Sequence, residues 1–187
     1  MLNLVSNRVV VLGVIFLLML MTRGSHFLTE LNLPDMSLIL FLILGFFIPS
    51  LILFFALFFV GALIDFGSAV FDITKGFCLT DGYWGLIPTY AILFYSGYLL
   101  KRKNLYQHLN FYVPVLLVSI TLAFIVSTNT YYIFSGRFGN PSFFESIMHG
   151  WNYYPAYLLT NVVYGLIFFF LLKLKSVSQF ISVFKSN

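Results

Sequence analysis

The sequence has little of two things on which soluble enzymes depend, charge and cysteine. Charged residues make up 9% of its 187 residues, only six of them are acids, and Cys78 is the single cysteine. A soluble domain carries about 25% charged residues, so an ordinary soluble domain is excluded. A lone cysteine cannot form an internal disulfide, and a disulfide exchanger, which needs paired cysteines, is excluded as well.

Several catalytic signatures are also missing. The chain has no glycine-rich phosphate loop, no H-E-x-x-H and no G-x-S-x-G. A closed zinc site needs four ligands, and Cys78, His26 and His149 supply three at most. A Cys–His nucleophile pair, made by Cys78 with His26 or His149, stays open, although no third orienting group is evident beside them.

What the chain has in abundance is apolar sequence, which accounts for 60% of its residues. This composition predicts an all-α integral membrane protein, with room for five or six spans in a single transmembrane domain, 1–187. The first run is kept as a span and not as a signal peptide, because no small-x-small cleavage pattern follows it. The apolar runs cover residues 9–21, 36–64, 84–100, 111–126 and 153–172.

The run 36–64 is too long for a simple span. If it were one helix it would be about 44 Å long at ~1.5 Å per residue, against a hydrocarbon core of ~30 Å. Pro49 and Ser50 stand at its middle. It is either one kinked and tilted helix, giving five spans, or two short spans meeting at a tight cytoplasmic turn. We favour the second, a compact bundle of six transmembrane helices with both termini cytoplasmic.

The basic residues stand at the ends of the apolar runs, as orientation by positive-inside charge requires, so no nucleic-acid partner is expected. The six-span arrangement puts more cations inside than outside, and the five-span arrangement gives the same ratio, so charge cannot choose between them. Both arrangements put Cys78 and the polar stretch 127–152 outside the cytoplasmic membrane. Six spans also put all six acids outside, either around a polar ligand bowl or in ordinary solvated loops. The inner cations would be Arg8, Lys101, Arg102, Lys103, Lys173, Lys175 and Lys185, and the outer ones Arg23, Lys75 and Arg137.

A polar island between two apolar runs, residues 65–84, contains Cys78, three of the six acids and Lys75. Charged groups near hydrocarbon tend to mark a site. Lys75 favours the thiolate form of Cys78 and Asp81 opposes it, and a thiolate is a donor that transition metals bind readily. Cys78 is therefore interpreted as a metal or cofactor ligand, with a buried and inert apolar cysteine as the alternative.

Several of these motifs together resemble the BtuM family, the cobalamin-specific substrate-binding S-components of energy-coupling-factor (ECF) vitamin transporters, which have six spans. The similarity runs in islands over roughly residues 23 to 165. Its most specific part is Cys-Leu-Thr-x-x-Tyr with Leu-Ile-Asp upstream. The matching stretches are His26…Leu33-Pro34-Asp35-Met-Ser37…Gly45-Phe-Phe, Ala62-Leu-Ile-Asp65, Phe77-Cys78-Leu-Thr80-Asp81-Gly-Tyr83…Leu86-Ile-Pro88-Thr-Tyr90, and Phe134-Ser135-Gly136-Arg137-Phe138 followed by Tyr154-Pro155.

The resemblance implies that the protein binds cobalamin (vitamin B12) for uptake and that the Cys78 thiolate is an axial ligand of the corrin cobalt on the extracytoplasmic side. It implies pocket roles for His26, Asp65, Tyr83 and Arg137. It also links Cys78 to reductive removal of the cyanide ligand, which would be chemistry at cobalt rather than ordinary enzyme catalysis.

An ECF energising module, with its coupling subunit and ATPases, is the partner that the resemblance implies. S-components often present an Ala-xxx-Ala face on the first span for docking that subunit. Here the first span offers only Gly13, with Val9 and Leu17 four residues to either side. Close small-residue packing of that kind is therefore in question. The alternative function is that of a thiol-dependent membrane enzyme or an assembly factor with no part in transport.

Overall fold

The apolar runs fold into α-helices in the computed structural model, which describes residues 2–23, 33–71, 79–139 and 141–174, with side chains from residue 7 onward. Throughout these ranges the chain is helical or in turns, without a β-strand, as the sequence predicts. The helices are α1 (Leu2–Arg23), α3 (Ser37–Phe47), α4 (Leu51–Phe71), α5 (Leu86–Arg102), α6 (Leu109–Phe134), α7 (Phe143–Gly150) and α8 (Tyr154–Lys173), with 3-10 turns η2 (Asp81–Gly85), η3 (Leu105–Gln107) and η4 (Trp151–Tyr153).

Three helical stretches of the described chain are long and apolar enough to cross a membrane: Leu51–Phe71, Leu109–Phe134 and Phe143–Lys173. Their outer faces are apolar and exposed, as lipid contact requires; on α4, for example, Ile52, Leu63 and Val70 are all exposed. These features define a membrane protein.

The long run 36–64 is broken into two helices, α3 and α4, at residues 48–50. Pro49 causes the break, because a proline disfavours the helical conformation of the residue before it. Ile48 accordingly has a non-helical backbone, with φ −137° and ψ 79°. The single kinked helix considered from the sequence is not what forms.

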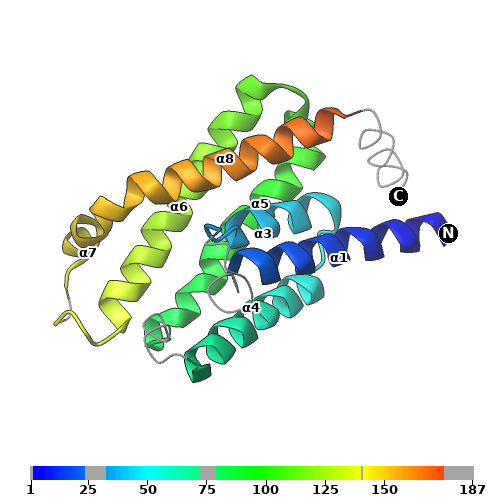
Figure 1. Ribbon diagram of the computed structural model, residues 1–187. Helices are drawn as coiled ribbons and strands as arrows, with labels where there is room; N and C mark the ends of the chain where they lie inside the picture. The colour runs from blue at the N-terminus through cyan, green and yellow to red at the C-terminus, as the bar shows by residue number, and fades with distance from the viewer. Residues whose placement is uncertain (1, 24–32, 72–78, 140, 175–187) are drawn as a thin grey trace.

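Helix α3 is the centre of the bundle, and Figure 1 shows it between α1 and α4 on one side and α6 and α8 on the other. Of its 11 residues all but Ile43 are buried. At ~1.5 Å per residue it is only about 16 Å long, roughly half the thickness of a ~30 Å hydrocarbon core. The central helix therefore fills only part of the height of the bundle.

Two elements are longer than the sequence indicated. Helix α6 continues to Phe134. The sequence predicted that the span would end at residue 126 and that a polar stretch would follow over residues 127–152. The polar side chains of this extension bond back to carbonyls of their own helix: Asn129 Nδ2 donates to Ile125 O at 2.8 Å and Thr130 Oγ1 to Val126 O at 2.9 Å. Helix α4 likewise continues past Asp65 to Phe71. In α6, these hydrogen bonds satisfy the polar side chains within the helix, so the helix continues where a polar loop was expected.

Helices α3 and α5 make the most extensive contact among the described elements, and glycine allows it. A Cβ at Gly97 would overlap the carbonyl oxygen of Leu42, and one at Gly45 would overlap the carbonyl oxygen of Phe94. The two backbones therefore pack directly against each other, as small residues permit between membrane helices.

We expect Gly97→Ala to lower the free energy of unfolding by about 1–3 kcal/mol, because the added methyl group forces α3 and α5 apart. Thermal unfolding in detergent measures this. Gly67→Ala on α4 is the matched control, because a Cβ there meets nothing within 4 Å. Equal unfolding temperatures for the two variants would contradict the close packing.

Candidate functional site

A cavity of about 1040 Å³ lies at one end of the bundle. Its walls come from the end of α1, the end of α4, η2, the start of α5, the end of α6 and the start of α8, and Pro34 and Asp35 lie just before α3. Among the described residues, none that lines the wall belongs to α3, whose first residue is Ser37. The cavity therefore lies beyond the N-terminal end of this short central helix.

Arg23, the last residue of α1, is the hub of the cavity's polar side. Its Nε donates to Asp65 Oδ1 at 2.8 Å and its Nη2 to Asp65 Oδ2 at 2.6 Å, which is the bidentate geometry of strong arginine–carboxylate pairs. Its Nη1 donates to Ser37 Oγ at 2.9 Å and to Tyr90 Oη at 2.6 Å. The Arg23 side chain is only 8% exposed. One guanidinium thus joins α1, α3, α4 and α5.

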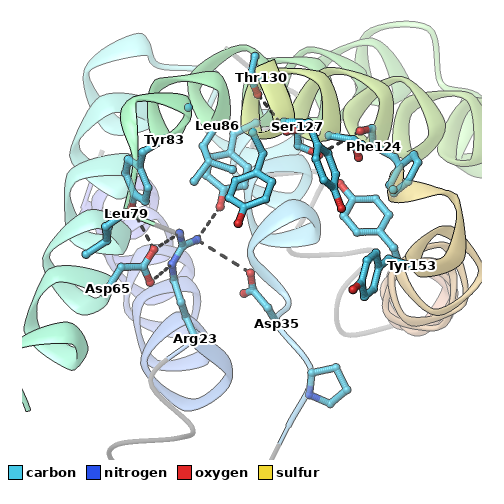
Figure 2. Close-up of a pocket in the computed structure, with 18 of the residues that line it drawn as sticks. Arg23, Asp35, Asp65, Leu79, Tyr83, Leu86, Phe124, Ser127, Thr130 and Tyr153 are labelled. Atoms are coloured by element: carbon cyan, nitrogen blue, oxygen red, sulfur yellow. Dashed lines mark hydrogen bonds and ion pairs between the residues drawn. The ribbon is translucent and has the colours of Figure 1, made fainter. Parts of the chain in front are cut away.

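Asp65 and Tyr83, both predicted site residues, are in direct contact. The Tyr83 hydroxyl donates to Asp65 Oδ2 at 3.1 Å, and both residues line the cavity. Burial raises the pKa of Tyr83 above its ordinary value, so the hydroxyl stays protonated and remains a donor at neutral pH. Figure 2 shows Tyr83, Asp65 and Arg23 converging, with Asp35 on the other side of the guanidinium.

The opposite side of the cavity is aromatic and hydroxylic. Figure 2 shows Phe124, Ser127 and Tyr153 there, across from the Arg23 group. Rings continue around the wall, because Tyr131, Tyr132, Phe138 and Tyr157 also line it. Such walls offer flat apolar faces together with neutral hydroxyls, which suits a ligand with a large apolar body and polar edges.

Two other residues considered from the sequence, Arg137 and His149, are not among the residues that line the cavity. Arg137 is exposed in the turn after α6 and is not among the residues lining the cavity, although its neighbour Phe138 is. His149 is exposed on α7, with its ring stacked on Tyr132 at a centroid distance of 5.5 Å. Cys78 and His26 lie outside the described residues. Within the described ranges, no group of three His, Cys, Asp or Glu side chains is arranged to hold a metal ion.

Sequence reasoning missed Arg23 as a site residue, because it was interpreted only as the charge that ends the first apolar run. The signal in the sequence is weak, because a charge inside a transmembrane segment usually pairs with another, whereas an arginine at the end of a span usually extends to the membrane interface. The sequence alone does not identify the partner, which lies 42 positions away.

The fold and site thus define an all-α membrane protein with a large, partly polar cavity at one end of its bundle. A comparison of the chain with protein-family models and with curated proteins finds no match. The resemblance to the BtuM family therefore rests on the sequence motifs alone, and the function it implies is a proposal.

The Arg23–Asp65 pair generates a stability prediction. Asp65→Asn should lower the free energy of unfolding by about 3–5 kcal/mol, because it leaves a buried guanidinium without its counter-charge. The double variant Arg23→Met/Asp65→Leu should lose less than the single variants Arg23→Met and Asp65→Leu added together, since it removes both charges. Denaturation in detergent gives the free energy of unfolding of each variant.

Asp81→Asn is the control for that series, because Asp81 is an exposed carboxylate at the start of η2 and its loss should change stability by less than about 0.5 kcal/mol. An Asp65→Asn variant as stable as Asp81→Asn would show that the ion pair does not support the fold.

Proposed function

We propose that this protein is a cobalamin-binding component of a vitamin uptake system, which captures the corrinoid from the outer face of the cytoplasmic membrane and passes it inward. The observation that carries the proposal is the cavity of about 1040 Å³ in whose wall Asp65 and Tyr83 meet. These are two of the residues that the resemblance had named for a corrinoid pocket.

The size of the cavity supports a large ligand. Small-molecule sites usually enclose about 300–1,000 Å³, and this one is at the upper limit of that range. A corrinoid is a wide, conjugated macrocycle edged with amide side chains. Its ring face suits the tyrosines and phenylalanines of one wall, and its amides suit the hydroxyls and carboxylates of the other.

Cys78 is the proposed axial ligand of the corrin cobalt. It lies outside the described residues, and its role rests on the resemblance and on the affinity of a soft thiolate for transition metals. Leu79, its neighbour in the sequence, lines the cavity. His26, also outside the described residues, is proposed as a further pocket residue. Arg137 is proposed to contact the ligand from the turn beside Phe138.

The distribution of charge supports an outward-facing cavity. Helix α5 ends with Lys101 and Arg102, and Lys103 follows directly. Arg8 on α1 is close enough to Lys101 to interact with it electrostatically. Lys173 at the end of α8 donates to the Gln107 carbonyl near them. The cations therefore gather at the end of the bundle opposite the cavity. By the positive-inside rule that end would be cytoplasmic.

Six spans with both termini cytoplasmic fit this arrangement, and in Figure 1 the start of α1 and the end of α8 lie at the same end of the bundle. Inward delivery by an ECF-type energising module is part of the proposal. The first span lacks the usual small-residue docking face, so that contact would have to involve other residues.

The decisive test is the absorption spectrum of protein purified from cells given a corrinoid. Wild-type protein should carry a corrinoid band altered by a cobalt–thiolate bond. Cys78→Ser should still fold and retain some corrinoid, but without that alteration, because a hydroxyl is a poor cobalt ligand at neutral pH. Corrinoid released from the denatured wild type supplies the reference spectrum.

If the wild type carries no corrinoid, a membrane enzyme or assembly factor becomes the better interpretation. If wild type and Cys78→Ser give the same bound spectrum, Cys78 is not a cobalt ligand and the buried, inert role would stand.

The cavity wall gives a second prediction. Tyr83→Phe removes from the cavity wall the hydroxyl that holds Asp65 in place. A corrinoid amide bound at this pair would lose a fixed polar partner, so corrinoid retention should weaken by about 1–3 kcal/mol. Tyr95→Phe is the matched control, since Tyr95 is exposed on α5 and does not line the cavity. Equal dissociation constants for the two variants, measured by spectral titration, would remove Tyr83 from the site.

A further inference from the structure

The charged residues of the cavity leave one negative charge unbalanced. Among the described residues that line it, the charged ones are Arg23, Asp35 and Asp65. Arg23 and Asp65 neutralise each other through two hydrogen bonds. Asp35 is farther away, with Oδ2 4.0 Å from Arg23 Nη1, which is beyond hydrogen-bond distance. The described wall therefore has a surplus carboxylate.

The Arg23 guanidinium is not available to receive a ligand anion. Of the five N–H donors of an arginine, four are used, two on Asp65 and one each on Ser37 and Tyr90. Its side chain is almost fully buried behind these partners. A carboxylate entering the cavity would thus meet Asp35 before it met an accessible positive charge from the described wall.

Asp35 is held in a fixed position. Its Oδ1 accepts from the Ser37 backbone N–H at 2.9 Å and from the Ser37 hydroxyl at 2.6 Å. The preceding residue is anchored as well, since the Pro34 carbonyl accepts from the Tyr164 hydroxyl at 3.0 Å. The Asp35 side chain is 53% exposed, so its Oδ2 can accept a hydrogen bond from a ligand. A rigid acceptor of this kind binds without the loss of side-chain freedom that a mobile one incurs.

The neighbouring polar groups are neutral. Ser68, Ser127, Thr128 and Thr130 line the cavity with hydroxyls, which can donate or accept and do not select a charge state. Among the described residues that line the cavity, Asp35 is therefore the group that can distinguish a neutral donor from an anion at the ligand's edge.

We propose that Asp35 is a specificity residue that accepts a hydrogen bond from a peripheral amide of the ligand and makes the site reject corrinoids in which that amide is a carboxylate. This inference rests on the proposed function. An amide N–H donates to the Asp35 carboxylate in a charge-assisted hydrogen bond. A carboxylate at the same place has no hydrogen to donate and adds like-charge repulsion at close range.

The test compares cobalamin with its separated monocarboxylates, in each of which one propionamide has been hydrolysed. Dissociation constants are measured by spectral titration of purified wild type, Asp35→Asn and Asp35→Ser. Both variants keep an oxygen that can cap Ser37 and both lose the charge. The wild type should bind at least one monocarboxylate about tenfold or more weakly than cobalamin. Both variants should reduce that ratio to within about threefold.

Glu145→Gln controls for overall charge, because it removes an exposed carboxylate that does not line the cavity and because glutamine can keep the cap at Ser142. This variant should keep the wild-type ratio. The inference is overturned if no monocarboxylate is disfavoured, or if the ratio stays the same in both Asp35 variants, while cobalamin still binds. If the wild type binds neither cobalamin nor any monocarboxylate, the proposed function itself fails and the inference fails with it.

Discussion

The bidentate ion pair between Arg23 and Asp65 is the interaction on which the cavity end of the molecule depends. Taking two charges out of water costs several kcal/mol for each ion, and only good geometry with further hydrogen bonds offsets that cost. Both conditions are met, because Tyr83 donates to the carboxylate and the guanidinium donates to Ser37 and Tyr90. The pair therefore fixes where four helices and η2 stand relative to one another.

The short central helix α3 is the second element that shapes the cavity end of the bundle, and it contacts the ion pair through Ser37. Helix α3 begins at Ser37, inside the Arg23 network, and ends at Phe47, so it fills the middle of the bundle and leaves the cavity beyond its first turn. Its direct backbone contact with α5 at Gly45 and Gly97 keeps it in place. Phe41 stacks on Tyr90 at a centroid distance of 4.4 Å, so the hydroxyl that receives Arg23 is itself positioned by the core.

Most helix positions followed from the sequence, because apolar runs of span length and a proline at position 49 are local signals. The ends of α4 and α6 did not, since polar side chains at 65 and 127–130 found partners in the folded protein instead of solvent. Asp65 and Tyr83 were predicted as pocket residues through motif resemblance, and both line the cavity. Arg23 was missed because pairing over 42 residues is a property of the fold, and Cys78 and His26 lie outside the described residues.

The two ends of the bundle are chemically different, and the central helix separates them. Cations gather where α5 and α8 end, whereas the described acids Asp35, Asp65, Asp81 and Glu145 stand at or near the cavity end. Between them α3 contributes 11 uncharged and almost wholly buried residues. The cations at the far end are more than a Debye length from the cavity and are largely screened there. On the described wall, Arg23 neutralises Asp65, and the charge of Asp35 makes this lining negative overall.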